Sequence, residues 1–184
     1  GTGLQARMQV EYLKKITVCR KVMVWGRNTE KSEEYSSYMM NLGFKVRICD
    51  SPKHVTDTCN LIITTTAATE PILFADDILP GTHITAMGSD TPAKQELDPN
   101  IMEKADCVVA DSIPQCIERG EISHALKDGK LTKNNIVELG HVLSGQHPGR
   151  TAQDQITVAD LTGVAVQDIQ IATAVYESFM ENES

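Results

Sequence analysis

The chain has 184 residues and a formal net charge of −8, with 41% hydrophobic and 23% charged residues. This length suffices for one domain with a sizeable core. The acidic balance argues against a protein that binds nucleic acid or an anionic membrane surface, and no run approaches the roughly 20 apolar residues of a membrane helix. We therefore predict a soluble, cytoplasmic protein whose partner is a small molecule or another protein.

The first element is a glycine-rich turn that opens a helix. In Gly1-Thr2-Gly3-Leu4-Gln5-Ala6 the first glycine permits a tight turn, the second lets backbone approach a pyrophosphate, and Ala6 lets the helix pack on a strand. The helix that follows carries Ala6, Val10 and Leu13 on one face, and its N-terminus offers free N–H groups and a partial positive charge. Alone the hexapeptide is weak support, but its position before a helix and a strand predicts dinucleotide binding.

Apolar, β-branched runs then alternate with helical patterns along the chain. The predicted strands are Lys21 to Trp25, Lys45 to Cys49, Leu61 to Thr66, His83 to Gly88, Cys107 to Ser112 and Gln155 to Asp160. Such alternation with nearly continuous apolar strands predicts a doubly wound α/β fold, in which helices cover both faces of a mostly parallel sheet.

Cap and stop residues mark the helices between these strands. Asn28 or Thr29 caps a helix that ends at Gly43, Ser51-Pro52 opens a short one, and Asp98-Pro99 opens another. Later helical candidates cover residues 116–127 and 135–143, and the closing helix carries an apolar strip. We predict a dinucleotide-binding domain over residues 1–150, followed by a strand and helix over 151–184 that return toward a further domain.

Cysteine and histidine usage is sparse. Five cysteines occur singly, in or beside apolar stretches, and five histidines lack metal-ligand spacing. We predict buried, reduced thiols and no metal site.

The end of the strand Lys21 to Trp25 bears on which cofactor binds. An Asp or Glu there would bond the ribose hydroxyl of NAD, but the sequence reads Trp25-Gly26-Arg27-Asn28-Thr29, with no carboxylate before Glu30. Arg27, with the side chains of Asn28 and Thr29, could hold a 2′-phosphate instead, which slightly favours NADP over NAD. The alternative is that Arg27 is a solvated turn residue and Asn28 only a helix cap.

Two further segments leave strand ends, where ligands lie in open α/β sheets. Thr66 ends one strand, although threonine is also a good strand former. In Gly88 to Lys94, Asp90 could transfer a proton or stabilise an iminium cation, but the same residues suit a plain Asp-Thr-Pro turn. Spacing alone leaves both interpretations of Asp90 open.

Several blocks together resemble the ornithine cyclodeaminase and mu-crystallin family. They are GTGLQA, VWGRN, TTTAATEPIL, PGTHITAMGSDTPAKQEL and DQITVADLTGVAVQD, and they span nearly the whole chain in order. The resemblance implies a Rossmann domain joined to a dimerisation and substrate domain, and a homodimer. Family members bind NAD(H) or NADP(H) and act on amino acids or cyclic imines. They include cyclodeaminases, amino-acid dehydrogenases, ketimine reductases and a branch linked to ectoine utilisation.

The resemblance also assigns roles by position. The opening hexapeptide would contact the pyrophosphate, and residues 27–29 the adenosine end. Thr66 and the run Ile84, Thr85, Ala86 and Met87 would flank the nicotinamide. Asp90 falls on the carboxylate that cyclodeaminases use as acid/base, with Lys94 following. The mu-crystallin branch lacks that Asp, so its presence favours a cyclodeaminase-like or ectoine-branch enzyme.

The reaction implied is internal redox on a diamino acid. Hydride leaves the α-carbon, the distal amine attacks the resulting imine, ammonia departs, and the hydride returns to give a cyclic imino acid. The alternatives are an amino-acid dehydrogenase or ketimine reductase with net redox, and a non-enzymatic NADP-regulated binding protein of the mu-crystallin type. The acidic residue expected of NAD-dependent cyclodeaminases and the family's N-terminal substrate-binding Lys and Arg are not found in this sequence.

One expectation concerns sheet completeness. In a doubly wound sheet the strand that precedes the glycine turn is central, so its absence would leave unpaired backbone beside neighbouring strands. We predict that upstream residues supply this strand, and that the chain is roughly the C-terminal half of a longer protein.

Overall fold

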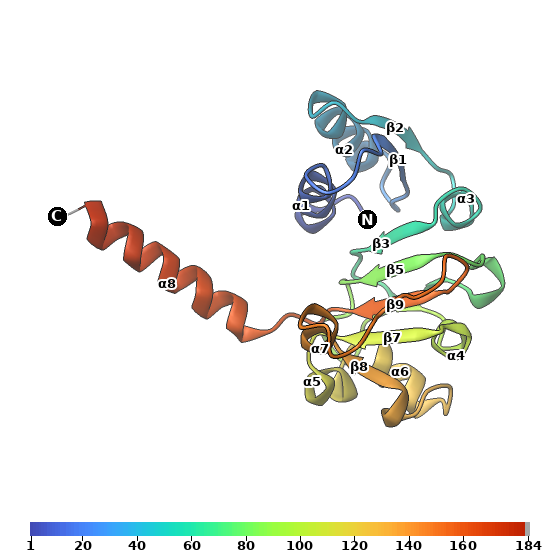
Figure 1. The fold of residues 1–184 in the computed structure, drawn as a ribbon. Coiled ribbons are helices and arrows are strands. Elements are labelled where there is room, and N and C mark those ends of the chain that lie inside the picture. The colour runs from blue at the N-terminus through green and yellow to red at the C-terminus, as the bar shows by residue number, and fades with distance from the viewer. Residues whose placement is uncertain (183–184) are drawn as a thin grey trace.

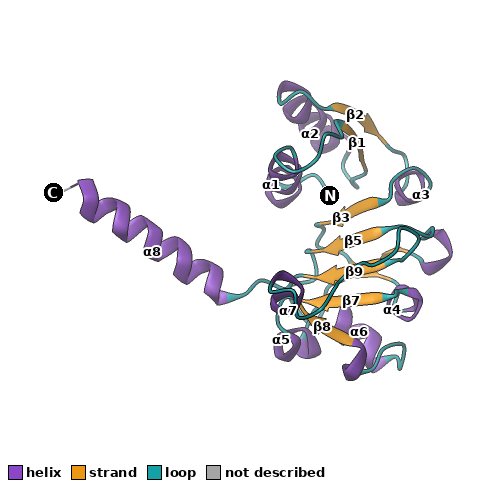
Figure 2. Cartoon of the chain, in the orientation of Figure 1, coloured by secondary structure: helices purple, strands orange, loops and turns teal. Residues whose placement is uncertain are grey.

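The computed structural model describes residues 1–182, with side chains for residues 1–165 and 168–180. Helices and strands alternate along most of the chain, as Figures 1 and 2 show. The helices are α1 Leu4–Leu13, α2 Thr29–Asn41, α3 Pro52–Thr56, α4 Asn100–Lys104, α5 Ile113–Glu118, α6 Glu121–Lys127, α7 Leu139–Leu143 and α8 Ala165–Asn182, with the 3₁₀ turns η1 Ala75–Asp77 and η2 Lys133–Asn135. The strands are β1 Lys21–Val24, β2 Lys45–Ile48, β3 Leu61–Thr64, β4 Thr69–Leu73, β5 His83–Ala86, β6 Gln95–Leu97, β7 Cys107–Ala110, β8 Ile136–Glu138 and β9 Thr157–Asp160.

The strands form one five-stranded sheet and two smaller ones. The large sheet has the order β3-β5-β9-β7-β8, while β1 pairs with β2 and β4 pairs with β6. Every described pairing is parallel. The α/β fold with a parallel, Rossmann-type sheet is therefore confirmed.

Strand pairing is interrupted between β1 and β3. Within residues 1–182 no ladder joins the β1-β2 pair to the five-stranded sheet, and Figure 1 shows the two parts lying one above the other. The interruption falls at the place where the sequence predicts a break. That upstream residues fill it stays a prediction.

The main core lies around the five-stranded sheet. Ile84 and Val158 have no exposed surface, and all four residues of β7 are buried. Helices cover these strands, so nearly continuous apolar runs are favoured over alternating ones. The predicted strand at Gln155 to Asp160 is confirmed as β9, which lies between β5 and β7. The domain boundary at residue 150 stays a prediction.

The β1-β2 pair has its own smaller core, formed with α1 and α2. Ala6, Val24, Tyr35, Met39 and Phe44 are buried together. The predicted helix cap and stop are confirmed, since Asn28 Oδ1 accepts a bond from Lys31 N and the backbone turns at Gly43 with φ +89°. The strand Lys21 to Trp25, which its apolar residues predict to be buried, is β1, and that expectation was wrong because only its last residue, Val24, is buried.

Three other expectations need correction. The predicted helix over 116–127 is broken into α5 and α6 at Gly120, which has φ +89°, and the predicted helix over 135–143 begins as strand β8. The sequence patterns also missed β4 and β6, whose three to five residues carry no clear periodicity. Finally, Cys19 is exposed, while Cys49, Cys107 and Cys116 are buried as predicted.

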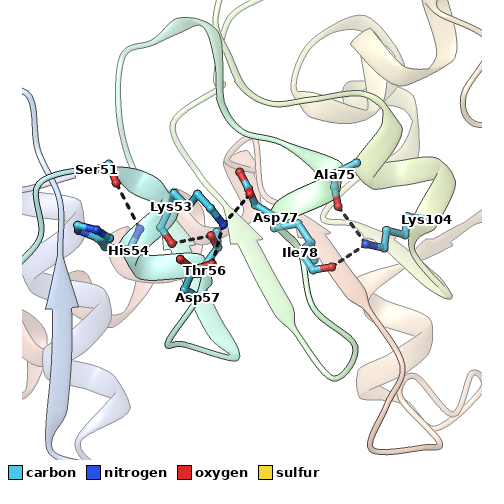
Figure 3. Close-up of polar contacts among 9 residues, drawn as sticks. All are labelled: Ser51, Lys53, His54, Thr56, Asp57, Ala75, Asp77, Ile78 and Lys104. Atoms are coloured by element: carbon cyan, nitrogen blue, oxygen red, sulfur yellow. Dashed lines mark hydrogen bonds and ion pairs between the residues drawn. The ribbon is translucent and has the colours of Figure 1, made fainter.

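Polar contacts join the short helices near the five-stranded sheet (Figure 3). Lys53 Nζ on α3 lies 2.8 Å from Asp57 Oδ1 and 3.0 Å from Asp77 Oδ1 on η1. Lys104 Nζ on α4 donates to the carbonyl oxygens of Ala75 and Ile78 at 3.0 and 2.7 Å. These contacts fix η1 between α3 and α4.

The closing helix α8 projects away from the rest of the chain in Figure 1. The side chains of Ile169, Tyr176 and Phe179 on this helix are more than half exposed. None of the helices in the described part of the chain has the length and apolarity to cross a membrane.

Candidate dinucleotide site

A cavity of ≈ 620 Å³ lies where the β1-β2 pair meets the five-stranded sheet. Its walls are the turn before α1, the segment after β1, the segment after β3, and strand β4. The lining residues are Gly1, Thr2, Gly3, Trp25, Gly26, Arg27, Asn28, Lys31, Thr65, Thr66, Ala67, Ala68, Thr69, Glu70, Pro71 and Ile72. The cavity therefore lies at the carboxyl ends of parallel strands, where open α/β sheets bind ligands.

The glycines of the opening turn fit a phosphate cradle. A Cβ added to Gly1 would collide with the Thr65 hydroxyl, and one added to Gly26 would lie 2.8 Å from Thr2 Cγ2, so a side chain at either position would have to displace a threonine side chain. At Gly3, by contrast, such a Cβ would meet no side chain or distant backbone within 4 Å apart from its immediate chain neighbours. The space beside Gly3 is open for a ligand.

The N-terminus of α1 supplies donors to that space. No side chain caps the helix, its first turn holds no acidic residue, and its first intrahelical bond runs from Arg7 N to Gly3 O at 3.2 Å. The preceding amides have no intrahelical acceptor, and the helix dipole favours an anion there. These features fit the pyrophosphate of a dinucleotide.

The six residues of the glycine motif do not play equal parts. Gly1, Thr2 and Gly3 line the cavity, whereas the side chain of Leu4 is 71% exposed and that of Gln5 is also exposed. Ala6 is buried in the smaller core, which agrees with its predicted packing role.

The segment after β1 brings two cations to the cavity. Of the residues predicted at the adenosine end, Arg27 and Asn28 line the cavity and Thr29 does not, and their contact with a cofactor stays a prediction. Lys31, on the first turn of α2, also lines the cavity. Lys31 was not predicted as a site residue. The Asn28 side chain caps the helix by accepting from Lys31 N, so the predicted cap could have pointed to Lys31. Glu70 on β4 is the carboxylate in the lining.

The predicted nicotinamide residues divide into two groups. Thr66 lines the cavity, and its amide donates to Glu96. Ile84 and Ala86 are fully buried in the main core, whereas Thr85 and Met87 are half-buried. Thr85 is hydrogen-bonded to His83. None of the run Ile84 to Met87 lines the cavity, so its contact with a cofactor stays a prediction.

Asp90 and Lys94 form an ion pair on the segment after β5. Lys94 Nζ lies 2.6 Å from Asp90 Oδ1, and the Asp90 side chain is 54% exposed. The Lys94 carbonyl accepts from Ser89 Oγ and lies 2.9 Å from His124 Nε2, which fixes the turn against α6. The two predicted catalytic residues are thus together, outside the cavity lining.

Buried carboxylates behind this turn were missed by the sequence patterns. Glu96, Glu121 and Asp160 are each at most 2% exposed. Burial raises the pKa of Glu121 to about 7 and also raises the pKa of Asp160. Their positions could not be read from the sequence, because Glu96 lies on the unpredicted β6 and Glu121 follows the unpredicted break at Gly120.

The model of the ornithine cyclodeaminase/mu-crystallin family matches residues 1–183. The chain belongs to this family. The match covers the glycine turn, the cation-lined strand end and the Asp90 turn, so the resemblance predicted from these sequence blocks is confirmed.

Related proteins of this family are similar over the full chain. An uncharacterized cyclodeaminase, y4tK of Sinorhizobium fredii, is 38% identical over 100% of this chain and 56% of its own length. An archaeal alanine dehydrogenase dimer with bound NAD superposes with a TM-score of 0.94 at 31% identity, covering 100% of this chain and 57% of its own. The Thermococcus litoralis Δ1-pyrroline-2-carboxylate reductase, solved with NADH and L-proline, gives 0.92 at 26% identity, covering 100% of this chain and 57% of its own. The chain spans about half the length of the relatives it matches.

Proposed function

We propose that the chain forms the NAD(P)-binding part of an ornithine cyclodeaminase-like enzyme, and that its substrate is an amino acid. The observation that carries the proposal is the joint placement of the uncapped α1 N-terminus and Arg27 in one cavity. Family membership supports a nicotinamide cofactor, as do the NAD bound to the similar alanine dehydrogenase and the NADH bound to the similar reductase.

We infer that NADP is slightly favoured over NAD. Arg27 and Lys31 place two cations in the lining against the single carboxylate of Glu70. The segment Trp25 to Thr29 holds no carboxylate for the ribose hydroxyls, whereas guanidinium and ammonium groups suit a 2′-phosphate. Titration of the full-length protein with NADPH and NADH tests this inference, and tighter binding of NADH would contradict it.

In the proposed reaction, the uncapped N-terminus of α1 and Arg27 would hold a nicotinamide cofactor, which would supply reversible hydride transfer at the α-carbon of a diamino acid. Asp90 transfers protons as the distal amine attacks and ammonia leaves, and its charge offsets the cationic imine. Lys94 orients the Asp90 carboxylate through the 2.6 Å contact. The segment after β3, with Thr66, bounds the cavity on the side of the five-stranded sheet.

The relatives bear on the choice between internal redox and its alternatives. The alanine dehydrogenase and the pyrroline-carboxylate reductase favour an amino-acid dehydrogenase or ketimine reductase with net redox. The cyclodeaminase of Sinorhizobium fredii favours internal redox. A non-enzymatic, NADP-regulated binding protein is the third alternative, and it predicts cofactor binding with no turnover.

Product analysis separates these reactions. Full-length protein is incubated with L-ornithine and a catalytic amount of cofactor, and both ammonia and reduced cofactor are measured. Ammonia without net reduction supports the cyclodeaminase, stoichiometric reduction supports the dehydrogenase, and oxidation of NAD(P)H with Δ1-pyrroline-2-carboxylate supports the reductase. Failure of all three reactions would contradict an enzyme of these classes.

The role of Asp90 is tested by substitution. We expect Asp90→Asn to lower kcat at least 100-fold with little change in cofactor affinity, because proton transfer contributes on the order of 10² to 10⁴ in rate. Asp76→Asn, at an exposed position on η1, is the matched control. Unchanged turnover by Asp90→Asn would contradict the assignment.

The full-length enzyme is proposed to be a homodimer. The exposed apolar side chains of α8 support this proposal, as does the dimeric state of the similar archaeal alanine dehydrogenase. Light scattering of the full-length protein tests it, and a monomer at micromolar concentration would contradict it.

A further inference from the structure

Glu96 joins the two strand ends that frame the predicted nicotinamide side. Its Oε1 accepts a bond from Thr66 N at 2.5 Å, and its Oε2 accepts one from Gly88 N at 2.8 Å. Glu96 has no exposed surface. It lies on β6, whereas Thr66 follows β3 and Gly88 follows β5. A single carboxylate thus contacts both segments.

These bonds continue the sheet beyond the end of its backbone ladder. Strands β3 and β5 pair up to Thr64 and Ala86, and the next bond runs from Met87 N to Thr64 O at 2.9 Å. Beyond it, the amides of Thr66 and Gly88 both donate to Glu96 instead of to the neighbouring strand. The carboxylate therefore sets the spacing of the two segments after the strands diverge.

Gly88 shows how closely this arrangement is packed. A Cβ at Gly88 would lie 2.5 Å from the Glu96 carboxylate and would collide with the Thr66 carbonyl oxygen. Because Gly88 does not have a positive φ, packing against Thr66 and Glu96, and not backbone conformation, requires glycine there.

The backbone of β6 is in turn fixed by Glu121. The amides of Glu96 and Leu97 donate to the two Glu121 oxygens at 2.8 and 3.0 Å. A charged or polar group buried without partners would cost several kcal/mol, but here each carboxylate oxygen has a backbone donor. Glu96 is therefore held in place on both sides.

Together these contacts assign a role that family membership does not name. We propose that Glu96 is a positioning residue for cofactor binding, which sets the Thr66 and Gly88 segments at the distance that the nicotinamide half requires. The inference rests on the proposed dinucleotide site, because Thr66 lines that cavity. It predicts that loss of the carboxylate affects the nicotinamide half and leaves the adenosine half unchanged.

The test compares a whole cofactor with a fragment of it. The variant Glu96→Gln keeps nearly the same side-chain shape but places an NH₂ group against one of the two amides. The full-length variant is titrated with NADPH and with 2′-phospho-ADP-ribose, a fragment that lacks nicotinamide. We expect NADPH affinity to fall about tenfold, since hydrogen bonds to charged groups are the stronger ones, and fragment affinity to stay within about twofold. NADH and ADP-ribose form the corresponding pair if NAD is the preferred cofactor.

Two further variants keep the test decisive. Gly88→Ala retains the carboxylate but displaces it, and it should reproduce the selective loss. Asp160→Asn changes a buried carboxylate that accepts from Ile122 N and contacts neither segment, so it should lower the unfolding temperature without changing the ratio of the two affinities.

The outcomes separate this inference from the proposed function. Three outcomes would overturn the positioning role alone. In the first, Glu96→Gln loses equal affinity for the whole cofactor and the fragment; in the second, folded Glu96→Gln loses no affinity for the cofactor. In the third, neither Glu96→Gln nor Gly88→Ala folds. If the wild-type protein binds neither cofactor, the proposed dinucleotide site fails, and the positioning role fails with it.

Discussion

The β1-β2 pair and the five-stranded sheet both consist of parallel strand pairs, but they differ in how far their side chains are buried. In the five-stranded sheet the apolar side chains of β5, β7 and β9 are almost fully buried. In the pair, β2 has no buried residue, and β1 has only Val24. The pair nevertheless contains mostly apolar residues, so composition alone does not decide burial.

The two regions also differ in whether their charged side chains are buried or exposed. The buried carboxylates Glu96, Glu121 and Asp160 all belong to the five-stranded side, where backbone amides satisfy them. The β1-β2 side instead carries exposed Arg27 and Lys31 toward the cavity. The five-stranded side therefore provides a frame of buried, hydrogen-bonded carboxylates, and the β1-β2 side provides an exposed, cationic wall.

The largest expected effect tests that frame. Ile84→Ala should lower the free energy of unfolding by about 4 kcal/mol, because truncation of a fully buried isoleucine leaves a cavity in a core closed on both faces. Chemical denaturation measures the loss. A loss below about 1 kcal/mol would show that the five-stranded core can collapse around the cavity.

The buried Glu121 predicts pH dependence on the same side. Its pKa is raised by burial from the ordinary value of 4.5 to about 7, so the folded state holds a proton that the unfolded state releases. The stability from this group is full below pH about 4.5 and is lost as pH rises to about 7, a change on the order of 3 kcal/mol. Denaturation of wild type and Glu121→Gln across this range measures it, and equal slopes would contradict it.

The smaller core should respond more weakly. Met39→Ala should cost about 2 kcal/mol and should speed amide hydrogen exchange in β1 and β2 before β5 and β9, since the exposed pair can relax around the cavity. The adjacent Met40→Ala is the matched control, because that side chain is 51% exposed. Simultaneous exchange of all four strands would indicate one cooperative core.

The smallest expected effect concerns the cationic wall. Arg27→Ala in the full-length protein should weaken NADPH binding about tenfold, or about 1.4 kcal/mol, with little effect on NADH, because the guanidinium is expected to bind the 2′-phosphate. Arg47→Ala, on exposed β2 and outside the cavity lining, is the control. Equal weakening of both cofactors would remove Arg27 as the selective residue.

Local signals predicted most of the elements. Asn28, Gly43 and the Ser51-Pro52 pair begin or end helices through bonds with near neighbours, and the apolar runs identify six strands. Strands β4, β6 and β8 could not be predicted, because their residues carry no clear apolar run or periodicity. At the break, Gly120 packs against Asp160, forty residues away in the chain: a Cβ at Gly120 would lie 2.6 Å from a carboxylate oxygen of Asp160.

The family, the alternation of strand and helix, and the glycine turn could be predicted from the amino-acid order, since each is carried by short sequence patterns whose residues lie close together in the chain. Two sets of contacts could not: the segments after β1 and β3 meet at one cavity, and Glu96 bonds both Thr66 and Gly88. Those contacts require strands to be placed in space, because a buried carboxylate acquires its role from the amides that surround it.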